Sequence, residues 1–181
     1  MTAGEAVACT DVRFAYPGGP LVLDIPSLVV ARGRTVFVHG PSGCGKTTLL
    51  GLLAGVLRAT AGTVRVLGTD LGTLSGARRD AFRAAHVGYV FQQFNLIPYL
   101  SAADNIALPC RLDAARRARL GAVPLDAAVR DVAARLDIAD LLDRPATALS
   151  VGQQQRVAAA RALIAAPELV ICDEPTSSLD A

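Results

Sequence analysis

A glycine-rich segment at residues 40–48 carries the first pattern that could bind a ligand. It reads GPSGCGKTT and satisfies the pattern G-x-x-x-x-G-K-[ST]. Glycines allow backbone N–H groups to surround a polyphosphate, and the positive end of a following helix points at the same anion. The pattern arises by chance in on the order of 1% of chains of this length. A simple glycine turn is therefore a poor alternative to a phosphate-binding loop.

The side chains of this loop have different expected roles. We expect Lys46 to reach the β- and γ-phosphates of a nucleotide, and Thr47 to supply a hydroxyl to Mg²⁺, which prefers oxygen ligands. Thr48 is interpreted as a helix residue rather than as a ligand, and Cys44 as a thiol beside the nucleotide. The candidate binding residues of the loop are Gly40, Pro41, Ser42, Gly43, Cys44, Gly45, Lys46, Thr47 and Thr48.

Two adjacent acids, Asp173 and Glu174, follow a short apolar run near the end of the chain. Open α/β sheets bind ligands at the carboxyl ends of their strands. Asp173 fits an anchor for Mg²⁺, and Glu174 fits the base that orients or deprotonates an attacking water. A helix cap at Asp173 is the alternative, but it leaves Glu174 unexplained. Together with Lys46 and Thr47, the acids indicate a nucleotidase whose residues converge on one magnesium-bound triphosphate.

Strands and helices must position these residues, and their patterns alternate along the chain. An antiparallel pair opens the chain, and later strands precede the phosphate loop and the two acids. Residues from about 95 to 149 carry no convincing strand, so we expect a helical insertion whose basic segment Arg111–Arg119 is a solvated surface. The predicted strands are Val7–Phe14, Leu21–Val30, Thr35–His39, Thr63–Leu67, His86–Phe91 and Leu169–Cys172; the predicted helices are Lys46–Leu57, Arg78–Ala85, Leu125–Leu136 and Gln153–Ala165.

Composition restricts the class of protein. The 181 residues are 52% hydrophobic, which can supply one core, and a net charge of +2 without a basic block argues against nucleic acid as a partner. We see no apolar run long enough to span a membrane and no secretion signal at the N-terminus. The four cysteines have no metal-ligand spacing, which suits a reducing cytosol. We therefore expect a cytoplasmic protein that does not insert into the membrane.

The segment LSVGQQQR at residues 149–156 makes the interpretation specific, because it resembles the LSGGQ signature of ABC ATPases. It precedes an alanine-rich helix, the two acids and then TSSLD at residues 176–180, in the order of that family. The resemblance implies an α/β P-loop NTPase core with a mostly parallel sheet, an N-terminal antiparallel β subdomain and an inserted α-helical subdomain. It implies a single domain over residues 1–181, with a core at about 1–94 and 150–181 and the helical subdomain at about 95–149.

The same resemblance assigns further residues. Gln92 resembles the Q-loop glutamine that contacts Mg²⁺ and senses the permease, with Gln93 as the alternative, and it joins Glu174 and Lys46 as a catalytic candidate. Tyr16 resembles the aromatic residue that stacks on adenine, although it could be an ordinary strand aromatic. The residues that resemble those closing on a nucleotide of the opposite subunit, or linking the two sites, are Ser150, Gly152, Gln153 and Asp180.

Ser150 and Gln153 also have the spacing of a capping box, which is compatible with that role. The implied function is MgATP hydrolysis coupled to transport by an inner-membrane permease, with the chain peripheral on the cytoplasmic face of the membrane and paired with a second ATP-binding subunit. The segment FQQFNLIPYLSAADNIALP at residues 91–109 looks most like the lipoprotein-releasing, macrolide-export and cell-division branch. ABC proteins that act on DNA or ribosomes carry tandem cassettes or long coiled-coil or basic insertions, none of which is visible here.

Two departures from the family pattern favour a second hypothesis. Val151 stands where the first signature glycine is usual, so its branched side chain should restrict the backbone and weaken an ATP sandwich. The family also places a switch histidine beyond the D-loop, whereas this sequence stops at Ala181 and neither His39 nor His86 lies in the required place. We therefore expect a core whose C-terminal part is missing. The alternative function is an ATP-dependent dimerising or regulatory module with little or no turnover.

Overall fold

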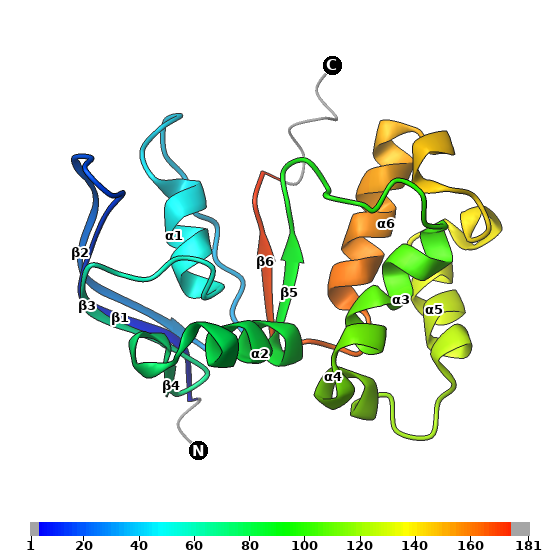
Figure 1. Cartoon of the computed structure of the whole chain (residues 1–181), viewed down its shortest axis with the longest axis horizontal. Coiled ribbons are helices and arrows are strands. Elements are labelled where there is room, and N and C mark those ends of the chain that lie inside the picture. Colours follow the sequence, from blue (N-terminus) through cyan, green and yellow to red (C-terminus); the bar gives the residue numbers. More distant parts are fainter. Residues whose placement is uncertain (1–3, 175–181) are drawn as a thin grey trace. The chain divides into compact units, whose positions relative to one another are not determined.

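The computed structural model describes residues 4–174. The chain divides into two compact units, Met1–Arg83 and Ala84–Ala181, and each is described by itself. Helix α2 (Gly76–His86) runs from the end of the first unit into the start of the second (Figure 1). No helix within residues 4–174 is long and apolar enough to cross a membrane.

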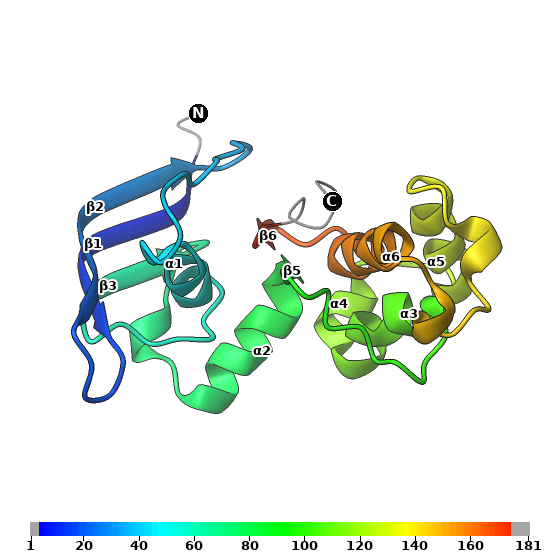
Figure 2. The same ribbon diagram turned by 90° about the horizontal axis from the view of Figure 1, so that it is seen from above.

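The first unit is built around an antiparallel sheet in the order β2-β1-β3-β4, with α1 on one face (Figure 2). The antiparallel pair β1 and β2 predicted from sequence is confirmed, and a turn with Gly18 at positive φ joins the two strands. Side chains such as Val12, Val66 and Leu52 form its buried core. Its elements are β1 (Glu5–Ala15), β2 (Leu21–Ala31), α1 (Lys46–Leu53), β3 (Ala61–Val66), β4 (Thr69–Asp70) and the 3-10 turn η1 (Leu71–Thr73).

The second unit joins two parallel strands to a group of helices (Figure 1). Strands β5 and β6 pair in register from Val87 opposite Leu169 to Val90 opposite Cys172. Helices α3, α5 and α6 enclose an apolar core that includes Ile106, Val132 and Val157. The elements are β5 (Val87–Val90), α3 (Ala102–Leu112), α4 (Ala114–Ala118), α5 (Leu125–Ala134), η2 (Ala139–Leu141), η3 (Ala146–Ala148), α6 (Val151–Leu163) and β6 (Leu169–Cys172). The predicted helical insertion is therefore present.

The predicted strand at Thr35–His39 is wrong, because this segment has no regular secondary structure. A strand needs a hydrogen-bonded neighbour. Within the described part of the chain, no ladder includes this segment, and the apolar side chains of Val36 and Phe37 are 54% and 86% exposed. The predicted helix Lys46–Leu57 ends four residues early, since Gly55 takes a positive φ and the N–H groups of Val56 and Leu57 turn back to the carbonyl of Gly51.

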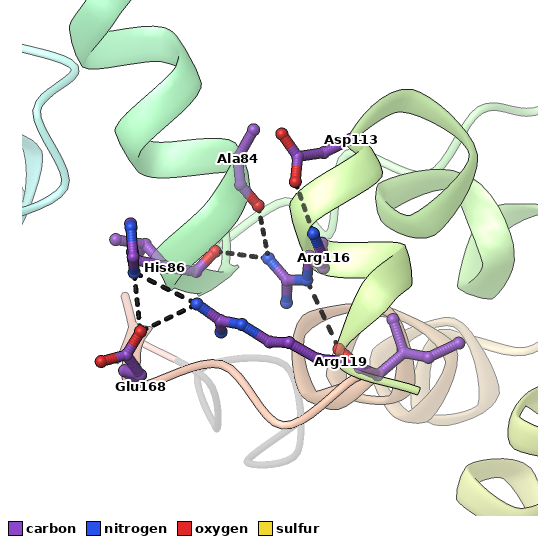
Figure 3. A network of polar contacts seen from close by, with 8 residues as sticks. Ala84, His86, Asp113, Arg116, Arg119 and Glu168 are labelled. Atoms are coloured by element: carbon purple, nitrogen blue, oxygen red, sulfur yellow. Dashed lines mark hydrogen bonds and ion pairs between the residues drawn. The ribbon is translucent and has the colours of Figure 1, made fainter. Parts of the chain in front are cut away.

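The solvated surface predicted for Arg111–Arg119 fails at Arg116, which is only 3% exposed, whereas other residues of the segment such as Arg111 are exposed. Its guanidinium donates to the carbonyls of Ala162 (2.8 Å) and Ile164 (3.4 Å) at the end of α6, and to those of Val87 (2.8 Å) and Ala84 (3.3 Å). Figure 3 shows this side chain beside Arg119, which reaches His86 and Glu168. Burial lowers the pKa of Arg116 from its usual value. One buried cation thus ties α4 to the ends of α2 and α6.

Candidate functional site

The glycine-rich loop of residues 40–45 leads directly into α1, as the phosphate-loop interpretation requires. Gly45 is the N-cap at φ 95°, and a Cβ there would lie 2.7 Å from a methyl group of Leu23. At Gly40 a Cβ would lie 2.6 Å from the Sγ atom of Cys44, so the thiol is folded over the loop backbone. A Cβ at either position would therefore force a neighbouring side chain to shift, and at Gly45 the positive φ favours glycine as well.

The N-terminus of α1 fits an anionic ligand. No side chain caps it and no acidic residue lies in its first turn, whereas α3 and α6 begin with serine caps. The first N–H groups of a helix lack partners within the helix and carry partial positive charge. Lys46, the first residue of α1, donates from Nζ to the carbonyls of Gly40 (2.9 Å) and Pro41 (3.0 Å), so its charge lies against the same loop. These donors match the requirements of a polyphosphate.

Tyr16 and Thr48 are brought together beside this loop. The hydroxyls of the two residues are 3.3 Å apart, and the ring of Tyr16 packs edge-on against Phe14 at 4.9 Å between centroids. The ring remains 49% exposed. Thr48 is buried in α1, as expected of a helix residue, while Ser42, Gly43 and Thr47 are exposed.

The two predicted acids lie at the carboxyl end of β6 in the second unit. Asp173 is only 5% exposed, and its backbone N–H donates to the carbonyl of Val90 on β5. The phenol of Tyr89 lies close enough to these residues for its pKa to be affected. Burial, the charge of Asp173 and the charge of Cys172 raise that pKa to about 12. Glu174 is exposed and adopts a positive φ of 46°. One acid is thus held inside and its neighbour turned outward.

Gln92 and Glu174 meet although 82 positions separate them in the sequence. The amide Nε2 of Gln92 donates to Oε2 of Glu174 at 2.9 Å. Parallel pairing of β5 with β6 produces this contact, because both residues follow the carboxyl ends of neighbouring strands. The contact involves Gln92, which the sequence interpretation preferred to Gln93. A carboxylate oxygen held in this way has a fixed orientation.

The signature segment forms the start of α6. Ser150 is the N-cap, and the predicted capping box is confirmed: Oγ of Ser150 accepts from the N–H of Gln153 (3.3 Å), and Oε1 of Gln153 accepts from the N–H of Ser150 (2.9 Å). A Cβ at Gly152 would meet nothing within 4 Å. Val151 is the first residue of α6, and its predicted effect on an ATP sandwich stays a prediction. Its side chain is 52% exposed.

Sequence reasoning missed Arg161, which lies near the C-terminal end of α6. Its guanidinium donates to the carbonyls of Phe94 (2.6 Å) and Asn95 (2.7 Å), in the segment that follows Gln92. The available signal was a lone cation among the buried alanines of this helix. Asp180 lies outside the described residues, so its predicted role stays a prediction.

Comparison with known proteins decides the family. The family model described as ABC transporter matches residues 23–177. The chain belongs to the ABC transporter family. The ATP-binding cassettes of this family bind ATP, usually with Mg²⁺. ATPase activity is a general property of cassettes in this family.

Individual relatives agree with this assignment. The cassette is 42% identical over 168 residues to the ABC transporter ATP-binding protein Rv0073 of Mycobacterium tuberculosis, covering 91% of this chain and 49% of that protein. It is 39% identical over 175 residues to the lipoprotein-releasing system ATP-binding protein LolD of Chromohalobacter salexigens, covering 95% and 72%. The chain thus spans about half the length of the mycobacterial relative. LolD belongs to the branch predicted from residues 91–109.

A solved structure confirms the fold class. The ATP-binding cassette MJ0796, in a dimeric post-hydrolysis state bound to ADP and Pi, superposes with a TM-score of 0.86 at 32% sequence identity. The match covers 97% of this chain and 76% of that one. The α/β fold with an N-terminal antiparallel sheet, a parallel sheet and a helical subdomain is that of an ABC cassette.

Proposed function

We propose that this chain is the ATP-binding subunit of an ABC transporter, which binds MgATP and couples its hydrolysis to substrate movement by a partner permease. The observation that carries the proposal is the glycine loop at the uncapped start of α1, with Lys46 laid against it. The chain's membership of the ABC transporter family supports the transport role. The permease, a second ATP-binding subunit and a position on the cytoplasmic face of the membrane are parts of this proposal.

Each candidate residue has a role in the proposed reaction. Lys46 would neutralise phosphate charge, and Tyr16 would stack on the base. Thr47, Gln92 and Asp173 would coordinate Mg²⁺ directly or through bound water. When bound, Mg²⁺ stabilises the negative charge that develops on the phosphate oxygens. Glu174 accepts a proton from water as the oxygen forms its bond to the γ-phosphorus, and the bond to the bridging oxygen of ADP breaks. The hydrogen bond from Gln92 fixes the carboxylate that takes the proton.

Binding and turnover can be separated with two variants. Lys46→Ala should abolish MgATP binding, because it removes the cation of the phosphate loop. Glu174→Gln should retain binding and lower the rate of phosphate release by about 10²- to 10⁴-fold, the usual contribution of a general base. Glu5→Gln, a matched change of an exposed glutamate at the start of β1, should alter neither. Equal binding by the wild type and Lys46→Ala, measured with a fluorescent ATP analogue, would contradict the proposal.

Val151 favours one alternative function, an ATP-dependent dimerising or regulatory module with little turnover. Its exposed branched side chain occupies the first turn of the helix that is proposed to close on a nucleotide of the opposite subunit. The same assay separates the two functions. Tight MgATP binding with equally slow phosphate release in the wild type and Glu174→Gln would support the module.

A further inference from the structure

The loop that carries Gln92 is held in a strained backbone conformation. Residues 91–100, between β5 and α3, have no helix or strand. Phe94 and Asn95 take positive φ values of 58° and 47°, and their N–H groups donate to the carbonyls of Phe91 (3.0 Å) and Gln93 (2.6 Å). Successive left-handed residues other than glycine persist only where their surroundings hold them.

Arg161 of α6 stabilises this backbone conformation at one end of the loop. Its two terminal nitrogens donate to the carbonyls of the two strained residues, Phe94 and Asn95, at 2.6 Å and 2.7 Å. The side chain is half-buried, and burial lowers its pKa from the usual value. A planar guanidinium can bind two adjacent carbonyls at once, whereas a lysine ammonium presents a single point charge. The contact is therefore specific to arginine.

Asn105 of α3 holds the other end of the same loop. Its side chain is fully buried, accepts from the N–H of Ile97 (2.8 Å), and donates to the carbonyls of Ile97 and Ser101 (both 3.1 Å). Two helices of the same unit thus fix residues 94–101 through buried polar side chains. Gln92 and Gln93, which precede the fixed part, stay exposed.

Helix α6 connects the Arg161 clamp, which is the pair of hydrogen bonds from Arg161 to Phe94 and Asn95, to the signature residues. Ser150 caps its N-terminus and Arg161 lies eleven positions later, which corresponds to about 16 Å along a helix. We propose that Arg161 is a positioning residue that makes the signature helix and the Gln92 loop move as one body, so that engagement of Ser150 on one nucleotide sets the position of Gln92. This inference rests on the proposed function, because it assigns Arg161 an effect on hydrolysis.

The experiment compares Arg161→Met and Arg161→Lys with matched changes at Arg130, an exposed arginine of α5. Three quantities are measured on the same preparations: amide hydrogen exchange at Phe94 and Asn95 without nucleotide, the dissociation constant for MgATP, and kcat and KM for phosphate release. The methionine variant keeps most of the side-chain volume, and the lysine variant remains informative if methionine prevents folding.

We expect loop exchange about tenfold faster and kcat about tenfold lower in Arg161→Met, the scale of one or two hydrogen bonds to a charged group, with KM and MgATP affinity nearly unchanged. Arg161→Lys should fall between this variant and the wild type, and the Arg130 variants should match the wild type. Unchanged loop exchange in Arg161→Met would overturn the clamp. Faster exchange with unchanged kcat would overturn the positioning role. A wild type that does not bind MgATP would refute the proposed function, and amide exchange at Phe94 and Asn95 would then still test whether Arg161 holds the loop.

Discussion

At the scale of residues, the candidate chemistry of the second unit is concentrated where β5 and β6 end. Asp173 is buried while Glu174 turns outward to accept a hydrogen bond from Gln92. The parallel register brings residues 82 positions apart into contact. The sequence named both groups from their motifs, but their contact could not be predicted, because it depends on which strands are neighbours.

Tyr89 provides a pH-dependent test of this environment. Burial and the charges of Asp173 and Cys172 raise its pKa to about 12 in the folded state, above the ordinary tyrosine value of about 10. The unfolded chain therefore loses this proton first as the pH rises, so the neutral phenol contributes stability below pH 10 that is lost between about pH 10 and 12. The urea midpoint of the wild type should fall more steeply between about pH 10 and 12 than that of Tyr89→Phe.

Asp173→Asn offers a control for the electrostatic part of this effect. Removing the carboxylate charge should make the pH dependence of the urea midpoint shallower, while burial maintains the rest. Identical pH profiles for the wild type and Tyr89→Phe would show that the tyrosine does not lie in the environment described.

At the scale of elements, Arg116 acts as a remote cap for α6. The last carbonyls of a helix have no partners within it. Arg116 supplies donors to the carbonyls of Ala162 and Ile164 and also reaches Val87 at the start of β5. Gly88 permits this close arrangement, because a Cβ there would lie 2.2 Å from the carbonyl oxygen of Ala162.

Arg116→Met should lower the free energy of unfolding by about 2–4 kcal/mol, because several buried carbonyls lose their donors while the volume is roughly kept. Urea denaturation monitored by circular dichroism measures the change. The neighbouring Arg117 donates to the carbonyl of Val123 at 3.2 Å in an exposed contact, so Arg117→Met should cost less than about 1 kcal/mol. Equal losses in the two variants would contradict the capping role of Arg116.

Arg116 also illustrates which elements sequence patterns can predict. The capping box at Ser150 and Gln153 is local, and it was predicted correctly from spacing alone. The partners of Arg116 come from Ala84, Val87 and α6, so a basic segment looked like a solvated surface. The prediction of a strand at Thr35–His39 was wrong for a related reason: an apolar run forms a strand only where another strand pairs with it, and its own sequence does not reveal that partner.

At the scale of the whole molecule, α6 presents its N-terminus outward while its C-terminal half is tied to the rest of the second unit. Val151 is exposed at one end, and Arg161 contacts the Gln92 loop near the other. The comparison structure MJ0796 is dimeric. Under the proposed function, a second copy of the cassette would meet the exposed end of α6, with a nucleotide between the two.

ATP-dependent dimerisation tests this arrangement, with Glu174→Gln used to prevent turnover. In MgATP, sedimentation should show a dimer of this variant, and adding Val151→Gly should tighten the dimer, because the branched side chain leaves the first turn of α6. Glycine in a helix costs up to about 1 kcal/mol relative to alanine, so tighter assembly would reflect contacts that outweigh a loss of helix stability. Val123→Gly, a matched change at a valine 48% exposed before α5, should leave the dimer unchanged. Dimers that form equally well with Lys46→Ala would show that assembly does not depend on the nucleotide.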